Sequence, residues 1–210
     1  MIKIIIADDH PLVRKGLREI LEGEIDLEIV GEAASGGEVL EAVRQKLPDV
    51  VITDLSMPGM SGLDMISALK QEHPKLPVLV LTMHPEDRFA VRSLKSGASG
   101  YMTKDSLPEE ITKAVRLLAS GKKYITESLA EKLAMELDKD ITRSPHETLS
   151  NREFQIMCAL ASGMKVKEIA EELSISIHTV NTHKARIMEK MNMKTIPELT
   201  LYAVENHLIE

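Results

Sequence analysis

The chain contains little cysteine and few aromatic residues. Its 210 residues include one cysteine, Cys158, no tryptophan, three tyrosines and two phenylalanines. A single cysteine excludes an internal disulfide and a thiolate metal cluster, and its apolar neighbours indicate a buried, inert thiol. No apolar run has the length of a membrane span, and the N-terminus lacks the basic region and cleavage site of a signal peptide. We therefore expect a cytoplasmic protein that does not contact membranes.

An excess of positive charge is also missing. The net charge is -7, which taken alone argues against a nucleic-acid partner. The charge is unevenly distributed, because residues 1–120 hold 14 Lys and Arg against 19 Asp and Glu, whereas residues 184–194 hold four basic residues and one acid. A small basic stripe on an acidic chain is compatible with local DNA contact.

The first 120 residues alternate short β-branched runs with amphipathic helical stretches. The pattern predicts strands at 3–7, 27–33, 50–53, 78–82 and 99–103, and helices at 11–21, 37–46, 63–71, 86–96 and 107–120. Two helix starts fit a capping box, one from Ser35 to Glu38 and one from Ser106 to Glu109. Five βα units predict an α/β fold with a doubly wound, five-stranded parallel sheet, which binds ligands at the carboxyl ends of its strands.

Residues 121–148 have the pattern of a linker, in which we expect a short helix from about 127 to 137 and a polar segment after it. Residues 149–210 are purely helical in pattern and predict a small all-α domain of four helices. Its first helix starts with a capping box from Ser150 to Glu153, flanked by Leu149 and Phe154 as a hydrophobic staple. We therefore expect two domains, 1–120 and 149–210, joined by the linker.

Three aspartates follow two of the predicted strands. Asp8 and Asp9 come after the first strand, and Asp54 comes after the third. If these strands are parallel neighbours, the carboxylates converge at one edge of the sheet and repel one another unless a cation intervenes. A divalent ion that prefers oxygen ligands, such as Mg2+, would solve this problem and leave one carboxylate as a nucleophile toward a phosphoryl group.

Together with Thr82, Lys104 and the run from Asp54 to Gly59, these aspartates resemble the receiver domain of two-component response regulators. The resemblance covers about 120 residues. It implies that a sensor histidine kinase phosphorylates Asp54, with Thr82 and Lys104 binding the phosphoryl oxygens. It also implies that Mg2+ is held by Asp9 directly, Asp8 through water, Asp54 and the backbone carbonyl of Ser56. Tyr101 resembles the aromatic switch of that family, or it is a half-buried packing residue.

Other chemistry fits the sequence less well. Mg2+-dependent phosphatases also use a strand-end aspartate as nucleophile, but Ser56 stands where their usual general acid lies. The sequence has no glycine-rich nucleotide-binding loop in this region. We therefore expect no enzyme, apart from phosphorylation and dephosphorylation of Asp54.

Residues 149–209 resemble the LuxR-type output domain of the NarL/FixJ group of response regulators. The residues that carry this resemblance are Leu149-Ser-Asn-Arg-Glu153, Gly163, Lys167-Glu-Ile-Ala170, Leu173-Ser-Ile175, Thr179-Val180, His183 and Lys190-Met191. The resemblance implies a helix-turn-helix whose third helix enters the major groove of double-stranded DNA.

A helical wheel of the third helix separates two faces. Val180, His183, Ile187 and Met191 recur at helical spacing and are expected to face the core, which favours a structural role for His183. The opposite face predicts base contacts from Asn181, Thr182 and Ala185. Contacts with the DNA backbone are expected from Lys165, Lys167, Lys184, Arg186, Lys190 and Lys194.

The two resemblances together predict a transcriptional response regulator, in which phosphorylation of Asp54 controls homodimerisation and DNA binding. Family resemblance places the dimer surface on the fourth helix, at Glu198, Leu199, Tyr202 and Asn206. The competing interpretation is a receiver whose output helices bind protein or RNA.

Overall fold

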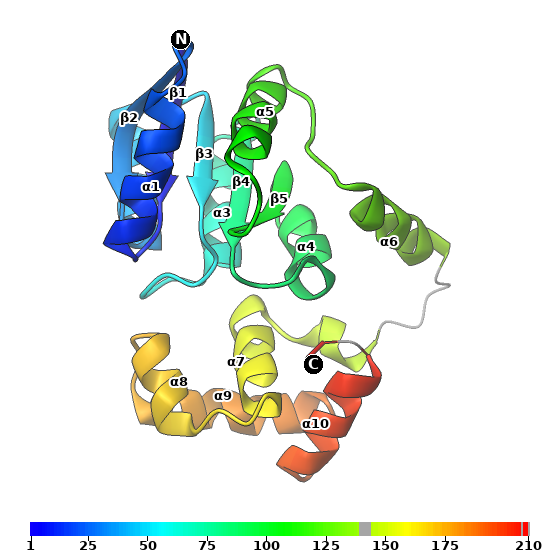
Figure 1. Cartoon of the computed structure of the whole chain (residues 1–210). Helices are drawn as coiled ribbons and strands as arrows, with labels where there is room; N and C mark the ends of the chain where they lie inside the picture. The colour runs from blue at the N-terminus through cyan, green and yellow to red at the C-terminus, as the bar shows by residue number, and fades with distance from the viewer. Residues whose placement is uncertain (139–143, 207, 210) are drawn as a thin grey trace. The chain divides into compact units, whose positions relative to one another are not determined.

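The computed structural model describes residues 1–138, 144–206 and 208–209, except the side chains of residues 87, 88, 132 and 135–138. The chain divides into two compact units, Met1–Leu133 and Ala134–Glu210. Figure 1 shows a sheet with helices in the first unit and helices alone in the second. Among the described residues, no helix is long and apolar enough to cross a membrane.

A parallel sheet forms the centre of the first unit. Its strands are β1 (Ile2–Ala7), β2 (Leu27–Ala33), β3 (Val50–Thr53), β4 (Val78–Thr82) and β5 (Gly100–Thr103), in the order β2-β1-β3-β4-β5. The prediction of a doubly wound, five-stranded parallel sheet is confirmed, with strand bounds within one residue. Ala7 pairs with Thr53 between β1 and β3, so the chain leaves both strands at the same edge. This pairing brings the residues after Ala7 and Thr53 together.

Helices cover both faces of this sheet. They are α1 (Pro11–Glu22), α2 (Gly36–Gln45), α3 (Gly62–Glu72), α4 (Glu86–Lys95) and α5 (Pro108–Ala119). In Figure 1, α1 and α5 lie in front of the sheet and α3 lies behind it. The front layer buries apolar side chains such as Leu21, Val115 and Leu118 against Ile4 and Ile52. Burial on both faces explains why the strands read as continuous apolar runs.

One predicted helix start is confirmed and another is wrong. The Ser35 hydroxyl accepts a hydrogen bond from the Glu38 backbone N–H at 3.3 Å and caps α2. The box predicted from Ser106 to Glu109 does not form, because α5 begins one residue later. Its first residue is Pro108, which has no N–H to satisfy and a backbone angle suited to a helix. The reciprocal bond therefore runs from the Leu107 N–H to the carboxylate of Glu110, at 3.2 Å.

The segment after α5 is attached to the first unit. The Tyr124 N–H donates to the Ser99 carbonyl at 3.0 Å, which gives a parallel bridge at the edge of β5. The Thr126 hydroxyl lies 2.8 Å from the carboxylate of Glu86 at the start of α4. Leu129, in α6 (Glu127–Asp138), is fully buried. Residues 124–129 were predicted as linker because a bridge of one residue leaves no alternating pattern in the sequence.

The second unit is helical throughout its described residues. It contains a short 3-10 helix, η1 (Pro145–Thr148), followed by α7 (Asn151–Ala161), α8 (Val166–Glu172), α9 (Ile177–Lys190) and α10 (Ile196–Glu205). The capping box of α7 is confirmed, since the Ser150 N–H donates to Glu153 at 2.8 Å and the Glu153 N–H donates to the Ser150 hydroxyl at 3.3 Å. Leu149 and Phe154 on either side are both buried, as a hydrophobic staple requires.

Candidate functional site

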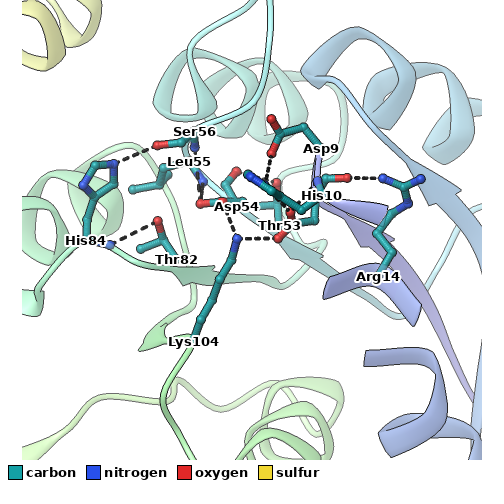
Figure 2. Close-up of polar contacts among 11 residues, drawn as sticks. Asp9, His10, Arg14, Thr53, Asp54, Leu55, Ser56, Thr82, His84 and Lys104 are labelled. Atoms are coloured by element: carbon teal, nitrogen blue, oxygen red, sulfur yellow. Dashed lines mark hydrogen bonds and ion pairs between the residues drawn. The ribbon is translucent and has the colours of Figure 1, made fainter. Parts of the chain in front are cut away.

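Asp54 lies at the carboxyl end of β3, in the centre of a group of polar side chains (Figure 2). Its side chain is almost completely buried. One oxygen, Oδ1, accepts backbone hydrogen bonds from Leu55 at 2.6 Å and Ser56 at 3.3 Å. The other oxygen, Oδ2, lies 2.6 Å from the Lys104 ammonium. The backbone therefore fixes Oδ1, whereas Oδ2 is bound by a lysine side chain.

Lys104 joins two of the predicted acidic residues. Its ammonium lies 2.6 Å from an oxygen of Asp8 and 2.6 Å from an oxygen of Asp54, and all three side chains are buried. Burial by itself raises the pKa of Asp54, but hydrogen bonds from Lys104 and Thr82 hold that pKa below its ordinary value. Burial lowers the pKa of Lys104, and the two carboxylates raise it above its ordinary value. Asp54 is therefore ionised at neutral pH and is available as a nucleophile.

Asp9 and His10 lie on the outer side of this group. Asp8, Asp9 and His10 place one ligand atom each within 4.8 Å of one another, as a metal site requires. The His10 Nδ1 lies 2.8 Å from an Asp9 oxygen and 3.4 Å from an Asp8 oxygen. Arg14, in the first turns of α1, donates to the Asp8 backbone carbonyl at 2.6 Å. His10 and Arg14 were not predicted as site residues, although the position of His10 directly after the aspartates is a signal for it.

The remaining predicted residues of this edge come from β4 and β5. Thr82, at the end of β4, is fully buried, and Tyr101, in β5, is also fully buried. The Tyr101 hydroxyl donates to the His84 carbonyl at 2.9 Å, and burial raises the pKa of that hydroxyl. The Nε2 of His84 lies 2.8 Å from the Ser56 hydroxyl. Tyr101 is therefore fully buried and not half-buried, and the loop after β4 contacts both sides of the site.

In the second unit, the outer face of α9 carries the predicted base-contacting residues. Asn181, Thr182 and Ala185 are all exposed. The Thr182 hydroxyl donates to the His178 carbonyl within the helix at 3.0 Å, which leaves the Thr182 methyl group for apolar contact. On the opposite face Val180, Ile187 and Met191 are buried, as the helical wheel predicts.

His183 also belongs to the inner face of α9 but is only partly buried. Its Nδ1 is buried and has no hydrogen-bond partner among the described residues. Burial lowers the pKa of His183, and neighbouring Arg152, Arg186 and Lys190 lower it further against the effect of Glu153. The structural role predicted for His183 fits this position, because a neutral ring packs there at lower cost than a charged one.

The basic side chains predicted to contact the DNA backbone do not form one uniform group. Lys165, Lys167, Arg186 and Lys194 are exposed, and Lys184 is partly exposed. Lys190 differs, since its ammonium lies 2.6 Å from the carboxylate of Glu153 in α7. Burial raises the pKa of Glu153, but the hydrogen bonds from Lys190 and Ser150 hold it below its ordinary value. Lys190 therefore has a structural partner with which a phosphate would have to compete.

The predicted dimer residues of α10 are also divided. Leu199 is fully buried inside the unit, so its inclusion in a dimer surface was wrong. Glu198 accepts a backbone hydrogen bond from Lys194 at 2.9 Å, and Tyr202 lies with its hydroxyl 2.7 Å from the Nδ1 of His146. Asn206 is exposed and donates to the Tyr202 carbonyl at 2.9 Å.

Two apolar residues of α10 were missed by the sequence analysis. Leu201 is 60% exposed and Val204 is 45% exposed. They are three positions apart, and therefore lie on the same face of the helix. The apolar pattern of α10 gave no signal for them, because Leu199 and Ala203 on the inner face are equally apolar.

Comparison with known proteins identifies both units. Residues 4–116 match the response regulator receiver domain, and residues 147–203 match the bacterial regulatory proteins of the luxR family. The response regulator GacA of Pseudomonas syringae pv. syringae (strain B728a) is 39% identical over 211 residues, which cover 100% of this chain and 99% of GacA. The oxygen regulatory protein NreC of Staphylococcus carnosus (strain TM300) is 40% identical over 215 residues, which cover 99% of each chain.

The solved structures include RcsB from Salmonella enterica serovar Typhimurium bound to the promoter rprA in the presence of the phosphomimetic BeF3-. It is 30% identical, has a TM-score of 0.64, and the match covers 96% of this chain and 98% of that chain. The predicted family and fold are therefore confirmed. The chain belongs to the NarL/FixJ-type response regulators, DNA-binding regulators of transcription in which a receiver domain precedes a LuxR-type domain.

Proposed function

We propose that a sensor histidine kinase phosphorylates Asp54, and that this phosphorylation controls dimerisation and DNA binding. The proposal rests on one observation: the two Asp54 oxygens have different hydrogen-bond partners. Backbone amides of Leu55 and Ser56 bind Oδ1, whereas the Lys104 ammonium binds Oδ2. Oδ2 is thus the oxygen that attacks the phosphorus of a phosphohistidine, whose imidazole leaves and takes up a proton.

The same geometry supports roles for Lys104 and Thr82 in the transfer. When a phosphoryl group is attached to Oδ2, the Lys104 ammonium follows the negative charge from the carboxylate to the phosphoryl oxygens. The buried Thr82 hydroxyl can then donate to another phosphoryl oxygen. Both side chains are already at the site before phosphorylation, so the transfer requires only short movements.

The acidic residues fit a divalent cation. Asp8, Asp9 and Asp54 offer carboxylate oxygens from the ends of two adjacent strands, and Ser56 offers its backbone carbonyl. Oxygen ligands of this kind suit Mg2+, which would neutralise charge on the phosphoryl group when bound. The Asp9 carboxylate is the more accessible of the first pair, because Asp8 is buried and held by Lys104. This supports direct binding by Asp9 and water-mediated binding by Asp8.

Exposed apolar residues near the same edge support a docking surface for the kinase. Leu12 at the start of α1, Met83 after β4 and Leu107 before α5 are 81%, 74% and 64% exposed. All three follow carboxyl ends of strands, as Asp54 does. Apolar side chains on an otherwise acidic domain are typical of a protein-binding surface. A partner seated there would cover the phosphoacceptor site during transfer.

A continuous set of contacts can carry the signal away from Asp54. The Tyr101 hydroxyl is bonded to the His84 carbonyl, and Glu86, two residues further on, is bonded to Thr126 at the start of the linker segment. A movement of the loop after β4 toward a phosphoryl group would therefore change the position of residues 124–129. We propose that this segment transmits phosphorylation toward the output domain.

The output domain then binds DNA through α9. Asn181, Thr182 and Ala185 contact base edges, whereas Lys165, Lys167, Lys184, Arg186 and Lys194 contact phosphates. Lys190 joins the phosphate contacts only by leaving Glu153. Because the ligand is chromosomal DNA, we place the protein in the cytoplasm.

Two copies of the chain pair through the exposed face of α10 that Leu201 and Val204 form. Glu198, Tyr202 and Asn206 surround this face. A dimer is expected because helix-turn-helix dimers read two half-sites.

Labelling by a small phosphoryl donor tests the assignment of Asp54. We expect Mg2+-dependent incorporation that is stable to acid and labile to alkali, as an acyl phosphate is, and we expect Asp54→Asn to abolish it. Asp49→Asn is a matched control, because Asp49 is an exposed aspartate directly before β3, at the opposite end of that strand from Asp54. Persistent labelling of the Asp54→Asn chain would refute the assignment.

A further inference from the structure

A cavity lies at the end of the receiver sheet opposite Asp54. It has a volume of about 440 Å³, within the range of small-molecule sites. Its walls come from the C-terminal end of α3, the loop before β4, the turn between α4 and β5, and the residues directly after α5. These segments stand at the amino ends of the strands, so the cavity is separate from the phosphoacceptor site.

The cavity is lined by four lysines, Lys70, Lys75, Lys122 and Lys123. None of the four forms an ion pair with a carboxylate among the described residues. The nearest acid in sequence, Glu72, is paired with Arg44 at 2.8 Å. This is unusual in a domain that has more acidic than basic residues, and it leaves the cavity with a strong positive charge.

Lys70 shows that the lysines also affect one another. Its ammonium donates to the Leu76 carbonyl at 2.5 Å, and its aliphatic stem lies over Gly97, where a Cβ atom would approach the Lys70 Cγ to 2.6 Å. Burial lowers the pKa of Lys70, and the charge of Lys123 lowers it further. Two like charges therefore face the same space without a counterion, and a bound anion would relieve their repulsion.

Helix dipoles explain only part of this arrangement. The C-terminal ends of helices favour lysines, and Lys70 lies in such a position. Lys75, in the loop before β4, and Lys122 and Lys123, after α5, lie outside the last turn of any described helix. The dipoles also give no reason for a cavity, whose remaining wall includes the apolar residues Pro74, Pro77, Leu94 and Leu118.

We propose that this cavity binds a small organic molecule that carries two or more phosphate groups. Four ammonium groups match the charge of two phosphates, which lysines bind as point charges. Pro74, Pro77 and Leu94, which are at least partly exposed, offer an apolar surface for the organic part of the ligand. The cavity ends at Lys123, next to the Tyr124 bridge that attaches the linker to β5. Occupancy would therefore stabilise the start of the linker.

Titration of the full chain with ADP, pyrophosphate and adenosine tests this proposal, with amide NMR signals as the readout and without added Mg2+. We expect ADP to shift the signals of Ala98, Ser99 and Gly121, pyrophosphate to bind more weakly, and adenosine to leave these signals unchanged. Replacing Lys122 and Lys123 by Gln should weaken ADP binding at least about tenfold. The matched control replaces Lys15 and Lys113, which are exposed lysines outside the cavity, and should bind ADP like the wild type.

Three results would overturn the proposal. ADP could leave the signals of the cavity unchanged, or shift only signals near Asp54 or in α9. Both double variants could lose affinity equally, which would indicate general attraction by surface charge. Pyrophosphate could bind as tightly as ADP, which would remove the role given to the apolar wall. Both substituted pairs are exposed, so neither variant is expected to affect folding, and unchanged signals in β1 and β3 check this.

Discussion

The phosphoacceptor edge of the receiver and the outer face of α9 hold their polar side chains in different ways. At the first, Asp8, Asp54 and Lys104 are buried and bonded to one another. At the second, Asn181 and Ala185 are exposed to solvent, and the partners that we propose for them are on the DNA. The fold itself arranges the buried network, and on our proposal this network binds one phosphoryl group. On our proposal, the exposed face acquires its partners only when DNA binds, so its specificity would depend on the DNA as much as on the chain.

The largest effect that distinguishes the two regions is expected from Lys104→Gln. Without the ammonium, the burial of Asp54 is offset less, so the pKa of Asp54 rises, and the phosphoryl oxygens lose a charged donor. We expect the rate of labelling by a small phosphoryl donor to fall about 100-fold. Lys113→Gln, an exposed lysine of α5, should label at the wild-type rate. Equal rates for Lys104→Gln and the wild type would mean that the buried network is not part of the chemistry.

A smaller effect, on the other region, is expected from Asn181→Ala. An exposed side chain that pairs with one base contributes about 1–3 kcal/mol to discrimination against the wrong base. The variant should therefore lose affinity for the selected DNA sequence while binding to unrelated DNA is unchanged, as measured by gel shift. Lys184→Gln is the contrasting variant, because loss of a phosphate contact weakens binding to all sequences and reduces the salt dependence. An equal loss on selected and unrelated DNA would remove Asn181 from the base contacts.

The smallest effect concerns Lys190. This lysine is predicted to contact the DNA backbone, and it is also paired with the buried carboxylate of Glu153. Lys190→Gln leaves the buried Glu153 without its ammonium and should destabilise the output domain by about 1 kcal/mol at neutral pH, because Lys190 is itself partly exposed. Hydrogen exchange of the α7 and α9 amides measures this loss, with Lys184→Gln as the control.

The pH dependence of this loss follows from the pKa of Glu153. The folded protein holds that pKa below its ordinary value of 4.5, so the stabilisation is complete above about pH 4.5 and disappears as the pH falls through the lowered pKa. The difference between the wild type and Lys190→Gln should shrink in the same range. A difference that persisted in acid would show that the ion pair is not its origin.

The sequence predicted features that depend on local pattern. The five strands and the positions of Asp8, Asp9 and Asp54 at their ends followed from runs of β-branched residues, and the inner face of α9 followed from helical spacing. These predictions succeeded because parallel strands must end at a common edge, and because a core residue must recur every three or four positions.

Features that depend on distant parts of the chain were missed. The Lys190 ammonium meets Glu153, 37 residues earlier, and no local pattern encodes that contact. The exposure of Leu201 and burial of Leu199 could not be separated, because both faces of α10 are apolar. The lysines of the cavity come from three segments that only the fold brings together. Tertiary packing, not propensity, decided each of these cases.

The most direct test of the central claim is DNA affinity measured with and without phosphorylation. A DNA fragment selected from a genomic pool by the phosphorylated protein is titrated with the wild type and with Asp54→Asn, each with and without the phosphoryl donor. Coupling between two sites typically changes affinity 5- to 150-fold, and we expect the donor to raise wild-type affinity by about tenfold or more. Asp54→Asn should not respond. If the donor left the DNA affinity of the wild type unchanged, or raised the affinities of the wild type and of Asp54→Asn equally, control of DNA binding by Asp54 would be contradicted.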